Sequence, residues 1–281
     1  MQTPCEPAEL YLDLMKKCLT RYIFPETHAP LRRPPLTIKH LAWAAYPSIA
    51  AVLKKRGITL HRETTVDLSR RAEGRDWPAD AETMIGLKRM DNLHFCVQQV
   101  IQQGVPGDFI ETGVWRGGAC IFMRAALQAY GDNSSLVWVA DSFEGLPKPD
   151  GRYAQDEGDR HWKKSDILGV SLEQVKANFS RYDLLDERVR FLKGWFKDTL
   201  PSAPIEKLSV LRVDGDMYSS TMDSLTNLYP KLSPGGYVII DDYNDIESCR
   251  KAVDDFRASN GIETPLNRID LSAIYWQKSR S

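Results

Sequence analysis

From Gly107 onward, short strand-like segments alternate with helix-like segments. The strand-like segments are rich in valine and isoleucine and almost continuously apolar, which is typical of strands covered by helices on both faces. This alternation predicts a doubly wound, Rossmann-like α/β domain whose sheet is mostly parallel. The predicted strands are GDFIET (107–112), SLVWVAD (135–141), RVRFLKG (188–194), LSVLRVDGD (208–216), GGYVIIDD (235–242) and SAIYWQKS (272–279).

Two regions of different character precede this domain. Residues 1 to about 80 contain short helical patterns, ELYLDLMKKCL and TIKHLAWAAYPSIAAVLKKRG, that prolines interrupt. They predict a helical N-terminal arm (1–80) that packs on the main domain, on a partner subunit or around a substrate. A second region, from about Ala81 to Gln103, has one apolar stripe and predicts the first helix of the domain (81–281). The stripe is formed by Met84, Leu87, Met90, Leu93, Val97 and Ile101.

Composition excludes several classes of protein. The formal net charge is -1, so no overall field would gather nucleic acid or an anionic membrane. The five cysteines form no Cys-x-x-Cys pair and no zinc-like cluster, which favours free thiols in a reducing compartment. The N-terminus has no signal-peptide pattern, and charged residues interrupt every apolar run. We therefore expect a cytoplasmic protein that binds neither nucleic acid nor membranes.

The first predicted strand runs into a glycine turn that opens a helix, Glu111-Thr-Gly-Val-Trp-Arg-Gly-Gly118. Gly113 permits a tight turn, and Gly117 and Gly118 would let a ligand approach the helix N-terminus. The spacing is not the G-x-G-x-x-G of dinucleotide sites, and an acid stands where a pyrophosphate would be repelled. The turn therefore favours a ligand with an amino group, such as the methionine part of S-adenosylmethionine. Glycines that serve only a tight turn are the alternative.

The next two strand ends also carry candidate cofactor residues. Asp141 ends the second strand, where a carboxylate can accept hydrogen bonds from both ribose hydroxyls of an adenosine. A helix cap is the alternative role for Asp141, and Ser142 and Phe143 beside it are weaker candidates. After the third strand, Gly194 is followed by the aromatic pair Trp195-Phe196, which would stack on an adenine or belong to the core.

Four carboxylates follow the fourth and fifth strands: Asp214 and Asp216, then Asp241 and Asp242. Because parallel strands end on one edge of a sheet, these side chains can converge in one crevice. Four unpaired anions repel one another and are costly to desolvate, and a hard divalent cation such as Mg²⁺ relieves that cost. Any one of these acids could be a helix cap or a surface residue, but two pairs after two apolar strands favour a metal site.

The chain resembles the family of macrocin, mycinamicin and novobiocin-pathway sugar O-methyltransferases from about Trp77 to the C-terminus. The motifs that carry the resemblance are Met84-Ile-Gly-Leu-Lys-Arg-Met-Asp-Asn-Leu93, Gly104-Val-Pro-Gly-Asp-Phe-Ile-Glu-Thr-Gly-Val-Trp-Arg-Gly-Gly118, Asp141-Ser-Phe-Glu-Gly-Leu-Pro147, Val213-Asp-Gly-Asp-Met-Tyr-Ser-Ser-Thr221 and Pro234-Gly-Gly-Tyr-Val-Ile-Ile-Asp-Asp-Tyr243. The resemblance implies a class I methyltransferase fold with a seven-stranded sheet. It also implies S-adenosylmethionine and Mg²⁺ as cofactors, and a hydroxyl of a small-molecule secondary metabolite, mainly on a deoxysugar, as acceptor.

The resemblance also suggests a role for each site residue. Asp214, Asp241 and Asp242 would hold the metal, while Asp216 would be the leading general base, with Asp214 also in the catalytic set. The predicted cofactor residues are Met84, Glu111, Thr112, Gly113, Val114, Trp115, Arg116, Gly117, Gly118, Asp141, Ser142, Phe143, Gly194, Trp195 and Phe196. We further expect a homo-oligomer.

His161 is an alternative base. It lies in Tyr153–Ser165, a polar and aromatic segment without regular periodicity, which predicts a mobile lid over the site. A solvated loop histidine is the competing interpretation.

Other functions remain open at this point. A nicotinamide-dependent oxidoreductase would share the fold but leave the acid pairs unexplained. A methyltransferase acting on a catechol-like, polyketide or peptide hydroxyl would share the metal. A non-catalytic assembly protein would be expected to lose these motifs.

Overall fold

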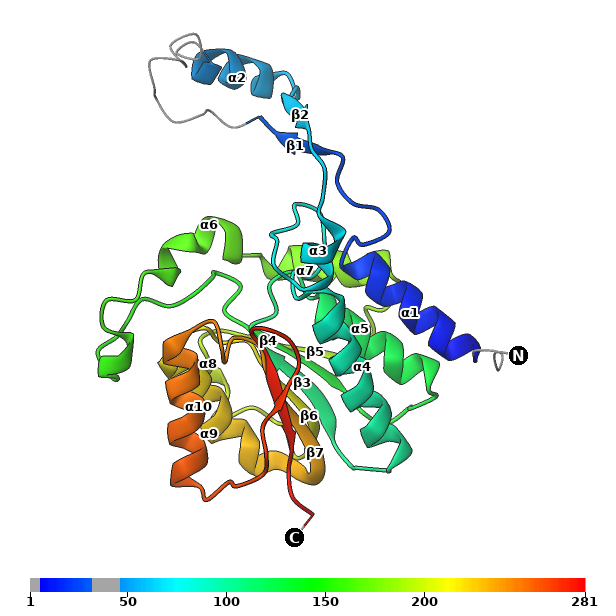
Figure 1. Ribbon diagram of the computed structural model, residues 1–281, viewed down its shortest axis with the longest axis vertical. Helices are drawn as coiled ribbons and strands as arrows, with labels where there is room; N and C mark the ends of the chain where they lie inside the picture. The colour runs from blue at the N-terminus through cyan, green and yellow to red at the C-terminus, as the bar shows by residue number, and fades with distance from the viewer. Residues whose placement is uncertain (1–5, 32–45, 281) are drawn as a thin grey trace.

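The computed structural model describes residues 6–31 and 46–280 and is built around a seven-stranded sheet (Figure 1). The strand order is β5-β4-β3-β6-β7-β9-β8; β9 pairs antiparallel with both of its neighbours, and the other pairs are parallel. The strands are β3 (Asp108–Thr112), β4 (Val137–Asp141), β5 (Val189–Lys193), β6 (Leu208–Val213), β7 (Leu232–Ile240), β8 (Asn267–Arg268) and β9 (Ile274–Gln277). The predicted mostly parallel α/β fold is confirmed. The two-residue β8 has no apolar pattern in the sequence, and it pairs only at the edge of the sheet.

Helices cover both faces of this sheet, as the apolar strands require (Figure 1). Successive residues of β3 serve opposite faces: Phe109 belongs to one buried cluster and Ile110 to the other. The first cluster includes residues of α4 (Gly86–Gln102), α5 (Gly118–Ala129) and α7 (Leu172–Arg181). The second includes residues of α9 (Tyr218–Leu228) and α10 (Glu247–Ser259). The four-residue α8 (Phe196–Thr199) follows β5.

The helix predicted from Ala81 begins only at Gly86. The preceding segment is held by other backbone contacts: Glu82 and Thr83 donate to the carbonyl of Leu19, and Gly118 donates to the carbonyl of Glu82. Because these groups bind non-local partners, the segment does not join the helix. From the predicted stripe, Met90, Leu93 and Val97 are fully buried, whereas its other members are partly exposed.

Part of the predicted arm belongs to the body of the molecule. Helix α1 (Pro7–Leu19) packs on α5, with Leu12 and Leu19 fully buried. The short α3 (Leu68–Ala72) is anchored by the buried Arg71, which binds Glu26 and Asp76. Parts of the predicted arm thus pack on the main domain, and the domain boundary near residue 80 stays a prediction.

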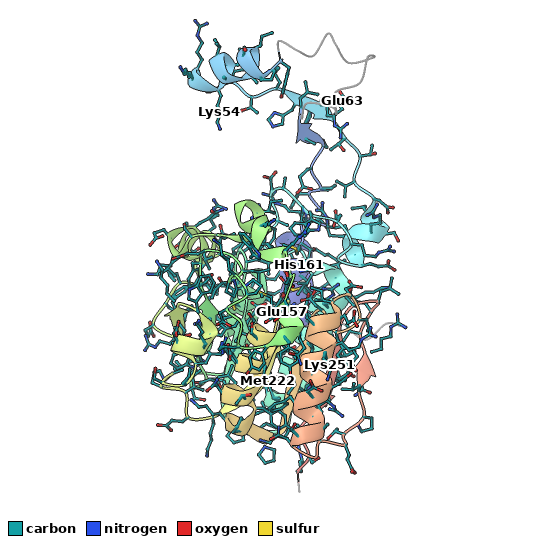
Figure 2. All side chains as sticks on the ribbon, turned by 90° about the vertical axis from the view of Figure 1, so that its left-hand side faces the viewer. Lys54, Glu63, Glu157, His161, Met222 and Lys251 are labelled. Carbon is teal, nitrogen blue, oxygen red and sulfur yellow. The ribbon has the colours of Figure 1, made fainter. Side chains whose placement is uncertain are left out.

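Only the middle of the arm extends away from the body (Figures 1 and 2). It contains the antiparallel strands β1 (His28–Pro30) and β2 (His61–Glu63), which the sequence did not predict. Helix α2 (Tyr46–Lys55) lies between these two strands in the chain, and it has no buried residue. The part of the second helical pattern that precedes Tyr46 lies outside the described residues.

The segment predicted as a lid, Tyr153–Ser165, has only short elements. These are η2 (Ala154–Asp156) and η3 (His161–Lys164), followed by α6 (Ser165–Leu168). In Figure 2, Glu157 and His161 lie above Met222 of α9 and Lys251 of α10. Within the described residues, no helix is long and apolar enough to cross a membrane.

We predict that α1 is an integral part of the folded body. Leu12→Ala should lower the free energy of unfolding by about 2–5 kcal/mol, because it removes a fully buried leucine from the core. Leu14→Ala on the same helix is the control: Leu14 is 52% exposed, and its loss should cost no more than about 0.5 kcal/mol. Urea denaturation measures both values. Equal, small losses would contradict the docking of α1 on the core.

Candidate active site

A cavity of about 830 Å³ opens at the carboxyl ends of the parallel strands. Its walls come from the turns after β3, β4, β5, β6 and β7, with the lid and the segment before α4 closing the sides. This is the edge at which ligands bind in open α/β sheets. The volume is also in the usual range for small-molecule sites, roughly 300–1,000 Å³. The cavity is therefore the candidate ligand site of the protein.

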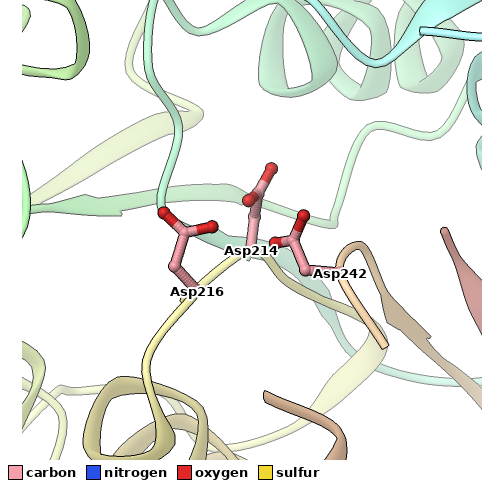
Figure 3. Close-up of side chains that lie close together, drawn as sticks. All are labelled: Asp214, Asp216 and Asp242. Carbon is pink, nitrogen blue, oxygen red and sulfur yellow. The ribbon is translucent and has the colours of Figure 1, made fainter. Parts of the chain in front are cut away.

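Three carboxylates meet on the floor of this cavity: Asp214, Asp216 and Asp242 (Figure 3). One oxygen atom from each lies within 4.8 Å of the others. Gly113 permits this arrangement, because a Cβ there would lie 1.8 Å from the carbonyl oxygen of Asp214. Asp216 has a φ of 54°, a left-handed conformation that is uncommon for a non-glycine residue and concentrates at functional sites.

Two members of this group are carboxylates whose charged form is disfavoured by their surroundings. Burial, and then repulsion from neighbouring aspartates, raises the pKa of Asp214 and of Asp242 well above its ordinary range. Within the described residues, the buried Oδ2 of Asp242 has no hydrogen-bond partner. A buried acceptor without a partner is costly, and a bound cation would satisfy it.

Asp241 lies beside this group but is held differently from the prediction. Its Oδ1 accepts a hydrogen bond from Arg212 and its Oδ2 one from Arg89, so both carboxylate oxygens are engaged by buried guanidinium groups. The three converging carboxylates are therefore Asp214, Asp216 and Asp242, whereas the predicted metal ligands were Asp214, Asp241 and Asp242. The role of Asp241 as a metal ligand stays a prediction.

Arg212 connects the ends of three strands. Its guanidinium group is 1% exposed and contacts Glu111 of β3, Asp214 after β6 and Asp241 after β7. Arg89 extends the network by binding Asp241 and, at 2.8 Å, Asp270. Sequence reasoning missed both arginines, although Arg212 interrupts an otherwise apolar buried strand. Such a charge needs buried partners, and this was the available signal.

The turn after β3 is tied to the turn after β4 by Asp141. Its carboxylate accepts hydrogen bonds from the backbone of Val114 at 2.8 Å and of Phe143 at 2.7 Å. Burial raises the pKa of Asp141, while these hydrogen bonds oppose the rise. Ten of the predicted cofactor residues line the cavity: Met84, Glu111, Gly113, Val114, Trp115, Asp141, Ser142, Gly194, Trp195 and Phe196.

The remaining predicted cofactor residues have other surroundings. Gly117 and Gly118 do not open onto the cavity: a Cβ would lie 2.9 Å from Val175 at Gly117 and 2.7 Å from Glu82 at Gly118. These two glycines therefore permit close packing within the protein, and their role toward a ligand stays a prediction. Thr112 accepts a hydrogen bond from the hydroxyl of Ser224. Arg116 donates hydrogen bonds to the carbonyls of Ala79 and Ala81. Phe143 packs in the hydrophobic core.

Glu111 faces a cation from the protein itself. It pairs with Arg212 and accepts a hydrogen bond from the thiol of Cys120 at 3.0 Å. Burial raises its pKa, and Arg212 opposes that effect. Glu111 lines the cavity, but the predicted interaction with an amino group of the ligand would be shared with this internal ion pair.

His161 lines the cavity from the lid, and its side chain is 38% exposed. Its Nδ1 lies 3.1 Å from Asp159 of the same segment. The structure therefore brings His161 to the cavity but does not include it in the carboxylate trio.

The sheet order, the cavity at the strand ends and the glycine turn after β3 define a Rossmann-like class I methyltransferase fold. The solved structure of the O-methyltransferase NovP matches with a TM-score of 0.81 and 47% identity, covering 97% of this chain and all of that one. The calicheamicin methyltransferase CalS11, with a TM-score of 0.52 and 18% identity, covers 98% of this chain and 94% of its own; it is a likeness of fold alone.

The chain belongs to the macrocin-O-methyltransferase family, whose model matches residues 8–278. It is 50% identical over 270 residues to a tetracenomycin-C rhamnosyl 4'-O-methyltransferase of Streptomyces olivaceus, covering 96% of this chain and 92% of the relative. It is 54% identical over 247 residues to the demethyldecarbamoylnovobiocin O-methyltransferase of Streptomyces niveus, covering 87% and 92%. The predicted family is confirmed, and the chain is an S-adenosylmethionine-dependent O-methyltransferase.

We predict that Arg212 is essential to the stability of the site. Arg212→Met should lower the free energy of unfolding by about 3–5 kcal/mol, because it leaves buried carboxylates without their cation. Arg190→Met, an exposed position on β5, is the control and should change little.

The loss in free energy of unfolding caused by Arg212→Met should depend on pH. Loss of the cation raises the folded-state pKa of Glu111 and Asp214 further, so protonation relieves the stress. The loss of stability should therefore be small near pH 4, which is about the pKa of these carboxyl groups in the unfolded chain. It should grow as the pH rises toward 7. Denaturant titrations at several pH values measure it, and a deficit independent of pH would contradict this account.

Proposed function

We propose that this enzyme methylates a hydroxyl on the sugar of a glycosylated natural product, with a divalent metal held at the ends of β6 and β7. The carboxylates of Asp214, Asp216 and Asp242, gathered on the floor of the cavity, carry this proposal. The relatives support the acceptor class, because their names describe methylation of a rhamnosyl tetracenomycin, a novobiocin precursor and mycinamicin III.

The residues present fit a hard cation such as Mg²⁺. They offer only oxygen donors, burial and then repulsion from neighbouring aspartates raise the pKa of Asp214 and of Asp242, and the Oδ2 of Asp242 has no other partner in the described residues. Asp214 and Asp242 are thus the principal ligands, and Asp241 joins them if it releases one arginine contact. When bound, the metal would lower the pKa of an acceptor hydroxyl and help to orient it.

In this proposal Asp216 is the general base that accepts the proton of the acceptor hydroxyl. Its carboxylate lies with those of Asp214 and Asp242, and its left-handed backbone fixes the direction of the side chain. A carboxylate there can accept the hydroxyl proton as the oxygen attacks the methyl group of the sulfonium. His161 remains the second candidate, since it lines the cavity but is fixed to Asp159 in the lid.

The methyl donor occupies the side of the cavity formed by the turns after β3, β4 and β5 in this proposal. Asp141 stands where the ribose hydroxyls would bind, and Trp195 stands where an adenine would stack. The donor and the acceptor would then meet above the carboxylates, so that holding the two groups in line supplies much of the acceleration.

The acceptor would enter between the lid and the segment before α4. Trp162 of the lid and Trp77, which is 53% exposed, both line the cavity and offer apolar surfaces for an aglycone. The expected homo-oligomer stays a prediction; the exposed Ile49 and Val52 of α2 are apolar residues that a second subunit could cover.

We predict that Asp216→Asn lowers kcat by about 10²–10⁴-fold, because general-base catalysis has that size. The assay follows methyl transfer from labelled S-adenosylmethionine to demethyldecarbamoylnovobiocin, mycinamicin III and, as a non-sugar control, catechol, with Mg²⁺ and with EDTA. Wild-type enzyme should methylate a glycosylated acceptor only with the metal. His161→Gln is the matched variant and should retain most activity. An Asp216→Asn enzyme that turns over at the wild-type rate would remove Asp216 from this role, and transfer to catechol alone would contradict the acceptor class.

A further inference from the structure

The lid is attached to helix α9 by a short run of contacts. Arg152, just before the lid, donates to both carboxylate oxygens of Asp223 at 3.0 and 2.9 Å. The ring of Tyr153 packs against the ring of Tyr218, with centroids 5.0 Å apart. These contacts place the start of the lid along the first half of α9, the helix that follows Asp214 and Asp216 in the chain.

Asp156 makes the most buried of these contacts. It is 3% exposed, and its two carboxylate oxygens accept hydrogen bonds from the backbone N–H groups of Tyr218 at 2.8 Å and Ser219 at 3.0 Å. The residue before α9, Met217, offers no side-chain cap. A helix start has several N–H groups without intrahelical partners and a partial positive charge, and a carboxylate satisfies both. The lid therefore supplies the cap that the helix itself lacks.

The capped residues follow Asp216 directly in the chain. On one side of Asp216 the backbone is fixed by β6, and on the other it enters a tight turn into α9, in which the N–H of Met217 contacts the carbonyl of Gly215. Asp216 itself has the strained φ of 54°. Strained residues persist only where the surroundings determine their conformation. The Asp156 contact fixes the far end of this turn.

We propose that Asp156 is a positioning residue that couples the lid to Asp216. When the lid lies over the cavity, its carboxylate holds the start of α9 and thereby keeps Asp216 in the conformation needed to accept the proton. This inference rests on the proposed function for the role of Asp216, but the coupling between lid and loop is a property of the structure that can be measured separately. The carboxylate of Asp156 binds the start of α9 and not the turns after β3, β4 and β5.

The experiment compares Asp156→Asn with Asp67→Asn in the full-length enzyme. Asp67 caps α3 through one carboxylate oxygen, which accepts from the N–H groups of Ser69 and Arg70, and it is not among the residues that line the cavity. An asparagine at position 67 can keep both bonds through its remaining oxygen, whereas one at position 156 keeps only one of two, so Asp67→Asn controls for the loss of a negative charge at a helix start. Hydrogen exchange, kcat, the KM for the best acceptor of the panel above and the affinity for S-adenosylhomocysteine are measured for each.

Asp156→Asn should speed hydrogen exchange in the lid and in residues 215–221 together, and lower kcat by about 100-fold, as a small misplacement of a reacting group does. Affinity for S-adenosylhomocysteine should stay at the wild-type value. Asp67→Asn should change none of these near the site.

Unchanged exchange in residues 215–221, or a loss of kcat shared equally with Asp67→Asn, would overturn the coupling. Failure of the proposed function is recognised differently. If Asp216→Asn retains activity while Asp156→Asn still loosens lid and loop together, the coupling stands and the identity of the base is wrong.

Discussion

The buried guanidinium group of Arg212 is the interaction on which the site depends. Three carboxylates from the ends of β3, β6 and β7 surround it, and they meet because these three strands are neighbours in the sheet. Each carboxylate alone would be costly to bury, and so would the arginine. Together they form a network that joins neighbouring strand ends and, through Arg89, reaches Asp270 near the C-terminus.

This network also explains why the cavity floor is only partly neutralised. Arg212 and Arg89 take both oxygens of Asp241, while Asp214, which also contacts Arg212, converges with Asp216 and Asp242 on the cavity floor. The same edge of the sheet therefore has one side held by arginines and one side where three carboxylates gather. The first keeps the strand ends in place, and the second is suited to a divalent metal and an acceptor hydroxyl.

The sequence predicted the features that follow from local pattern. Apolar strands alternating with helices indicated the doubly wound sheet, and the acids after the fourth and fifth strands indicated a shared crevice, which the position of Asp214 and Asp242 agrees with. The motifs predicted the family, and the family match confirms it.

Features that depend on distant partners were missed. Gly117 and Gly118 accommodate α7 and the segment around Glu82, which the turn pattern did not indicate. Asp156 looked like one polar lid residue among many, because its partners lie more than sixty residues away in α9. The pairing of Asp241 with two arginines, rather than with the converging acids, was likewise invisible in a linear pattern.

The central claim is that these carboxylates form a metal site, and direct binding of a spectroscopic cation tests it. Mn²⁺ can replace Mg²⁺ at oxygen-rich sites, and its EPR signal in solution decreases when it binds. We expect wild-type enzyme to bind Mn²⁺ at a single class of site, Asp242→Asn to lose that binding, and Asp245→Asn, at the cavity rim, to retain it. Absence of binding to the wild type, or equal binding by Asp242→Asn, would contradict the account.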